Sequence, residues 1–125
     1  MELNELSRIA LQCAFKVHAD LGPGLLESAY EACTYYELCE AGLTVEKQKV
    51  LPVTYHNVKL DAGYRVDLLV EDSLILEIKA VKALDEVHFS QLLTYLKLAD
   101  CKLGLLLNFN VKSLKQGIRR VVNVY

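Results

Sequence analysis

The chain has 125 residues, of which 53% are hydrophobic and 24% are charged, and its formal net charge is −2. This length and composition exclude a disordered chain, and we expect a single domain with a buried core over residues 1–125. The slight acidic balance also excludes attraction of polyanions by overall charge, so contact with nucleic acid would rest on local basic groups. Candidates, which ordinary solvated faces explain equally well, are Lys47 with Lys49 and the C-terminal group Lys112, Lys115, Arg119 and Arg120.

The first segment is predicted to be an amphipathic helix over about residues 2–20. Apolar residues recur there at steps of three and four, and charged residues between them exclude a signal peptide or a membrane span. We therefore expect a cytoplasmic protein. The four cysteines show no C-x-x-C spacing, which favours reduced core thiols over a zinc site.

The rest of the chain is predicted to follow the order α-β-β-β-α-β-β after this first helix. Glycines and prolines mark the ends of several elements, and the change from helical to alternating periodicity marks the start of the strands. The expected elements are a helix over 26–41, a strand over 45–55 interrupted near Pro52, an extended run over 58–70 bent near Gly63, a strand over 74–81, a helix over 84–99 and strands over 103–109 and 118–124. The turns His56-Asn57 and Glu71-Asp72 should join the three middle strands into a meander.

Strand alternation places charged residues within two of these apolar strands. Val66, Leu68 and Val70 should share one face and Asp67 and Leu69 the other. In the next strand, Glu77 and Lys79 should project together, beside Ile75 and Val81. A hairpin at Glu71-Asp72 pairs residues whose numbers sum to about 143 or 144, which makes Asp67 and Glu77 neighbours.

Two adjacent carboxylates repel one another, and a divalent cation that binds both removes the penalty. Mg²⁺ prefers oxygen ligands of this kind. The alternative is a solvated salt-bridge cluster of Asp67, Glu77 and Lys79 on an exposed sheet face. The apolar residues on the same face argue that a helix covers it, so that the charges line a cleft.

Two further groups of polar residues lie in the predicted helices. Glu27 and Tyr30 share a face at the start of the second helix, where the helix dipole also explains a carboxylate. His88, Gln91 and Tyr95 form a stripe on the later helix, which in isolation is typical of the polar edge of an amphipathic helix.

Together these motifs resemble the GxxExxY proteins, a branch of the PD-(D/E)xK nuclease superfamily. Gly24, Glu27 and Tyr30 match the namesake motif, Asp67 and Glu77-Ile78-Lys79 match the acid and E-x-K elements, and the run from Gln91 to Tyr95 matches the following helix. Val66 stands where proline often precedes the acid. The resemblance implies an α/β, restriction-endonuclease-like fold: a mixed central sheet flanked by helices, with an α-β-β-β-α-β core.

The resemblance also implies hydrolysis of phosphodiester bonds with Mg²⁺ or Mn²⁺, on DNA before RNA. Asp67, Glu77 and the carbonyl of Ile78 would hold the metal, and Glu27 would ligate it or position a water. Lys79 would act on the attacking water or the phosphorane, and Gln91 and Tyr95 would orient the phosphate, with His88 a weaker candidate. The alternative is a catalytically silent binding or assembly module on the same fold. A homodimer could supply recognition surface that the short chain lacks.

Overall fold

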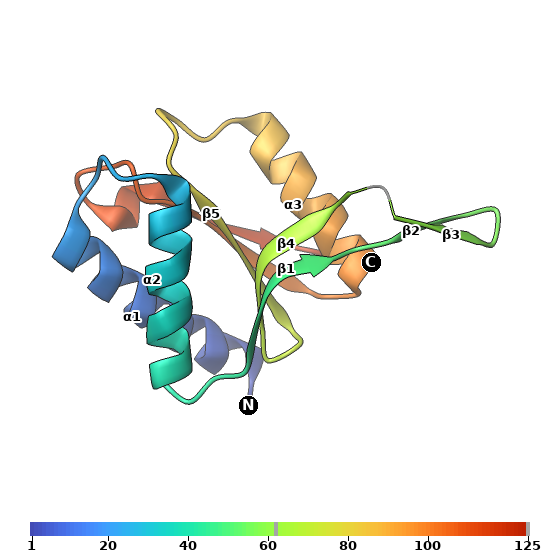
Figure 1. Cartoon of the computed structure of the whole chain (residues 1–125), viewed down its shortest axis with the longest axis horizontal. Coiled ribbons are helices and arrows are strands. Elements are labelled where there is room, and N and C mark those ends of the chain that lie inside the picture. The colour runs from blue at the N-terminus through green and yellow to red at the C-terminus, as the bar shows by residue number, and fades with distance from the viewer. Residues whose placement is uncertain (62, 125) are drawn as a thin grey trace.

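A computed structural model describes residues 1–61 and 63–124 (Figure 1). Two helices come first, a βαβ crossover lies near the middle, and a short 3₁₀ helix precedes the last strand. The bounds are α1 (Leu3–Leu21), α2 (Glu27–Glu40), β1 (Val45–Val50), β2 (Val53–Tyr55), β3 (Val58–Leu60), β4 (Arg65–Val70), β5 (Leu74–Lys79), α3 (Glu86–Ala99), β6 (Leu103–Asn108), η1 (Leu114–Gly117) and β7 (Ile118–Val122).

The central sheet has five strands in the order β1-β4-β5-β6-β7. Strands β5 and β6 pair in parallel, because α3 carries the chain back to the same end of the sheet between them, and the other described neighbours in this sheet are antiparallel. The expected mixed sheet with flanking helices is therefore confirmed, and the fold is consistent with the restriction-endonuclease-like class.

The sheet is covered on both faces, which fixes where polar side chains can reach solvent. Helices α1 and α2 pack on one face through a cluster that includes Leu6, Leu38, Leu68 and Leu76. Helix α3 packs on the other through a cluster that includes Leu92 and Ile75. Helix α3 thus covers the sheet face that carries Leu69 and Ile75, as predicted.

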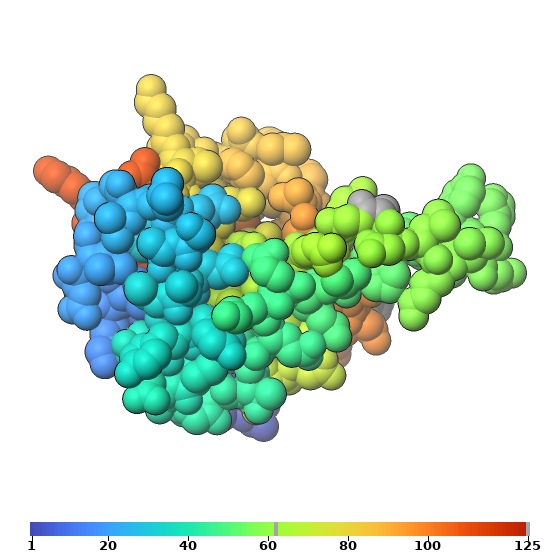
Figure 2. Space-filling view, viewed as in Figure 1, coloured from blue at the N-terminus to red at the C-terminus, as the bar shows by residue number. Residues whose placement is uncertain are grey.

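The two long extended runs each divide into two strands. Their inner halves, β1 and β4, pair within the main sheet, whereas their outer halves, β2 and β3, form a separate two-stranded sheet. We call residues 53–60 the arm; it projects from the body of the molecule (Figures 1 and 2). The predicted turn at its tip is confirmed, with His56 at φ 49° and Asn57 at φ 64°, as in the turns that favour tight hairpins.

Two details differ from the sequence prediction. Val66 packs with the cluster beneath α3, and not with Leu68 and Val70 on the opposite face. The pairing of β4 with β5 ends at Leu68; beyond that point β4 pairs with β1 alone, Val66 opposite Lys49, and its twist turns Val66 toward α3. Helix η1 was also not expected.

Within the described residues, no helix has both the length and the apolar character that crossing a membrane requires.

Candidate active site

Asp67 and Glu77 are brought together where the ladder between β4 and β5 stops. The register runs from Val70 opposite Leu74 to Leu68 opposite Leu76. One step further, side chains replace the ladder: the Asp67 N–H donates to Glu77 Oε2 at 2.8 Å, and the Ile78 N–H donates to Asp67 Oδ2 at 2.8 Å. The predicted neighbourhood of the two carboxylates is thus present, and each is fixed by a backbone amide of the other's strand.

Glu77 is a buried carboxyl, with only 4% of its surface exposed. Burial raises the pKa of Glu77 to about 8, and the charge of Asp67 raises it too, while the Asp67 amide and the ammonium of Lys79 act in the opposite direction. An ionised Glu77 therefore needs more positive charge beside it than these groups supply. A pocket of this kind favours a cation.

Two residues that sequence reasoning missed complete the acidic group. Gln48 on β1 donates from Nε2 to both carboxylate oxygens of Glu31 at 3.0 Å and to Asp67 Oδ1 at 3.2 Å. Burial raises the pKa of Glu31, the amide of Gln48 lowers it, and the charges of Asp67 and Glu27 raise it. The spacing of Glu31, one helical turn after Glu27, was a usable signal. Nothing in the sequence indicates the left-handed backbone of Gln48, whose φ is 51°.

The namesake motif shapes the entry to α2. Tyr30 is fully buried, and its ring stacks on Phe109 at 4.6 Å between centroids. Its hydroxyl donates to the Gly22 carbonyl at 2.5 Å and accepts from the Leu25 N–H at 3.1 Å. Tyr30 is therefore a structural residue that anchors the loop before α2. Although we expected it to share a helix face with Glu27, Tyr30 is buried and Glu27 is exposed.

Glu27 is exposed and lies at the exit of β5. Its Oε2 accepts from the Ala80 N–H at 3.3 Å. Within the described residues, no hydrogen bond or ion pair joins it to Asp67 or Glu77. Its place near the metal stays a prediction.

The remaining predicted site residues approach from β5 and α3. Lys79 is half-buried, and its effect on the pKa of Glu77 reflects its proximity. Tyr95 is buried; burial raises its pKa, and the charges of Glu77 and Asp67 raise it further. Gln91 is exposed and lines, with Tyr64 and Tyr95, a groove of about 260 Å³ on α3. Tyr95 thus connects the acidic pair to this groove.

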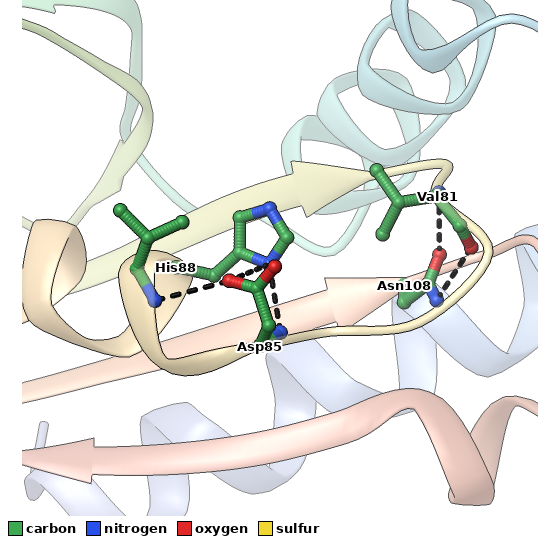
Figure 3. Close-up of polar contacts among 5 residues, drawn as sticks. Val81, Asp85, His88 and Asn108 are labelled. Carbon is green, nitrogen blue, oxygen red and sulfur yellow. Dashed lines mark hydrogen bonds and ion pairs between the residues drawn. The ribbon is translucent and has the colours of Figure 1, made fainter.

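His88 has a local structural role. Its Nδ1 accepts from the Asp85 N–H at 3.1 Å, and Asp85 Oδ1 accepts from the Val87 N–H at 3.0 Å (Figure 3). The two side chains form a capping box that satisfies amides at the start of α3. This cap gives the histidine a structural role, and its part in the chemistry stays a prediction.

The donor set fits a hard divalent cation of the magnesium type. Across residues 1–61 and 63–124, no three His, Cys, Asp or Glu side chains are grouped as a metal cage. Mg²⁺ rarely uses such cages, and proteins usually hold it by one or two carboxylates together with water and substrate phosphates. The Asp67–Glu77 pair meets that requirement. The Gln48 amide donates to the carboxylates of both Glu31 and Asp67, so this region of the protein favours groups that carry partial or full positive charge.

Comparison with known proteins agrees with this geometry. The family model described as the PD-(D/E)XK nuclease superfamily matches residues 4–121. Neither a curated protein nor a solved structure matches the chain. The match covers both helical layers and all five strands of the main sheet, and the chain belongs to the PD-(D/E)XK nuclease superfamily.

Proposed function

We propose that this protein is a metal-dependent nuclease of the GxxExxY branch that hydrolyses phosphodiester bonds in nucleic acid, with DNA before RNA. The observation that carries the proposal is the carboxylate pair at the point where β4 and β5 separate, with Lys79 two residues beyond Glu77. Superfamily membership makes such a reaction the natural reading of this geometry.

Asp67, Glu77 and the carbonyl of Ile78 would hold the ion, and Glu27 would ligate it or position a water. Bound Mg²⁺ or Mn²⁺ would supply Lewis-acid polarisation of the phosphate and a lowered pKa of the attacking water. Glu77 sits in a pocket where burial disfavours its charge, so a bound cation would stabilise its ionised form.

The chain's own groups would position the phosphate and stabilise its charge. Lys79 carries a fixed positive charge on the same strand as Glu77, suited to stabilise negative charge that develops on the phosphate oxygens. Gln91 can donate amide hydrogens to a phosphate oxygen from the groove on α3. Tyr95 is buried near the acidic pair, whose charges raise its pKa, and its hydroxyl would help to orient the phosphate.

The test is a cleavage assay with single-stranded, duplex and branched DNA and RNA, in Mg²⁺, Mn²⁺ or EDTA. We expect metal-dependent cleavage that Asp67→Asn removes, together with the Mg²⁺-dependent rise in melting temperature. Lys79→Ala should slow cleavage by roughly 100-fold or more and leave that rise in place. Asp72→Asn in the β4–β5 turn and Lys59→Ala on the arm are the matched controls.

The alternative is a binding or assembly module on the same fold. It predicts that the wild-type protein cleaves none of the substrates and shows no Mg²⁺-dependent rise in melting temperature. Mg²⁺ would then leave the melting temperature of Asp67→Asn unchanged, as it leaves that of the wild type. Cleavage that is unchanged in Lys79→Ala would contradict the assignment of that lysine.

A further inference from the structure

A second cavity opens at the carboxyl ends of the parallel strands β5 and β6. Its volume is about 210 Å³, and its lining includes Lys82, Arg119 and the amide side chains of Asn108 and Gln116. None of the described lining residues is acidic. The cavity is therefore a concave, positively charged site in a chain whose net charge is −2.

The cavity adjoins the proposed active site through the backbone. Asn108 in its wall is the register partner of Lys79 in the β5–β6 ladder, and the Phe109 N–H donates to the Lys79 carbonyl at 2.9 Å. Asn108 also holds the exit of β5: its Oδ1 accepts from the Val81 N–H at 3.1 Å, and its Nδ2 donates to the Val81 carbonyl at 3.0 Å (Figure 3). Lys82 follows directly. The cavity thus begins at the residue that pairs with Lys79 in the β5–β6 ladder.

The other wall is held in place by a close backbone contact. A Cβ at Gly117 would lie 2.2 Å from the Asn108 carbonyl oxygen, so only glycine allows η1 to pack against the end of β6. This contact brings Gln116 and Arg119 to the cavity. Arg119 donates from one guanidinium nitrogen to the carbonyls of Gln116 at 3.1 Å and Ile118 at 2.8 Å, which orients the group.

Within the part of the chain that the structure describes, neither Lys82 nor Arg119 forms an ion pair. Asp85, the nearest acid along the chain after Lys82, is engaged in the cap of α3. An ammonium, an oriented guanidinium and two amides around one concavity match the oxygens of a phosphate group.

We propose that this cavity binds a phosphate of the same nucleic-acid strand that the Asp67–Glu77 site acts on, flanking the scissile phosphate. That the ligand is a nucleic-acid strand rests on the proposed function. That it is an anion follows from the cavity alone. It assigns Lys82 and Arg119 to substrate binding, with no part in the bond-breaking step.

The experiment measures the affinity of the full chain for fluorescent single-stranded DNA and RNA oligonucleotides in EDTA, with and without a 5′-phosphate. The test variant is Lys82→Ala/Arg119→Ala. The control is Lys102→Ala/Arg120→Ala, which has the same net charge: Lys102 precedes β6 at the opposite end of the sheet, and Arg120 bonds to Asn4. Lys82→Glu alone, at an exposed position, serves if Arg119→Ala perturbs η1.

We expect the test variant to bind roughly tenfold or more weakly than the control, and its salt dependence to fall by about 0.7 in slope for each lost phosphate contact. A loss confined to 5′-phosphorylated strands places a terminal phosphate in the cavity, and an equal loss for both strands places an internal one. Wild-type affinity in the test variant, or wild-type protein that binds no strand, would overturn the proposal.

A cleavage assay separates this result from the proposed function. A wild-type protein that cleaves nothing in Mg²⁺ or Mn²⁺, yet binds strands through Lys82 and Arg119, would refute the nuclease and leave the phosphate site standing. Cleavage by the wild type with unchanged binding in the test variant would refute the phosphate site alone.

Discussion

At the scale of single residues, Glu77 couples folding to pH. In the folded protein its pKa is raised from 4.5 to about 8, chiefly by burial, so the folded state holds this proton more tightly than the unfolded state does. The resulting stabilisation is complete below about pH 4.5 and is lost as the pH rises through about 8. The group thus opposes folding in alkaline, metal-free solution.

We predict that urea unfolding in EDTA shows this loss directly. Between pH 5 and pH 9 the free energy of unfolding of the wild type should fall relative to that of Glu77→Gln, which cannot ionise. Glu46→Gln, at an exposed position on β1, is the control and should follow the wild type. Parallel profiles for wild type and Glu77→Gln would show that Glu77 is not buried in its neutral form.

Gln48 acts on the same site from β1. Its amide separates Glu31 and Asp67, so its removal leaves two carboxylates without a shared donor. We predict that Gln48→Ala lowers the free energy of unfolding in EDTA by about 1 kcal/mol and enlarges the Mg²⁺-dependent rise in melting temperature. Thermal unfolding with and without Mg²⁺ measures both, with the exposed Gln12→Ala as control. A smaller rise in the variant would mean that Gln48 supports the cation.

At the scale of elements, the start of α2 depends on one buried hydroxyl. Tyr30 ties the loop at Gly22 and Leu25 to the helix, so Glu27 begins α2 at a defined place beside the exit of β5. The loop also needs Gly24, whose φ is 104°, a conformation that disfavours residues with a Cβ.

We predict that Tyr30→Phe lowers the free energy of unfolding by about 1–3 kcal/mol, because the Gly22 carbonyl and the Leu25 amide lose part-buried hydrogen bonds. Cleavage by the folded variant should fall as well, since the start of α2, where Glu27 lies, would no longer be held in position. Tyr36→Phe lies on the exposed face of the same helix, where Tyr36 is 59% exposed, and should change neither quantity. Urea titration and the cleavage assay decide; a stable Tyr30→Phe protein would contradict the anchoring role.

At the scale of the whole molecule, the chain divides into a two-faced sheet and an arm that stands apart from it (Figure 2). Residues 54–60 are all exposed, and an isolated two-stranded hairpin contributes little stability in water. Replacement of residues 54–59 by Asn-Gly would keep Val53 opposite Leu60 and remove the outer two pairs.

We predict that this shortened chain unfolds within about 1 kcal/mol of the wild type, because the removed pairs pack on nothing in the body. Denaturation and sedimentation equilibrium would be compared at equal protein concentration. A homodimer built through the arm would instead give a lower mass for the shortened chain, and a stability that depends on protein concentration.

The sequence predicted the parts of this structure that local periodicity determines. The helices and strands, and the proximity of Asp67 and Glu77, followed from alternation and from a tight turn that sets the register. The division of the long runs into β1, β2, β3 and β4 was less accessible, because the choice of partner for each half is made by tertiary packing.

The part of the site that could not be predicted depends on geometry that no pattern encodes. Gln48 reaches Glu31 and Asp67 from a left-handed backbone conformation, and Val66 turns toward α3 where β4 no longer pairs with β5. Tyr30 looked like a companion of Glu27 on one helix face, yet burial against Phe109 decides its direction. His88 was indistinguishable from a site residue until the cap at Asp85 was visible.

Because side chains replace the β4–β5 ladder at the site, deuterium exchange of two backbone amides can report on it. The amides of Asp67 and Ile78 are held by the two carboxylates that would bind the cation, and not by the carbonyls of a neighbouring strand. Their exchange with deuterium should therefore follow the state of the two acids, while the amides of Leu68 and Leu76 follow the opening of the sheet. The exchange rates of these two amides can thus show, without any substrate, what is bound to the Asp67–Glu77 pair.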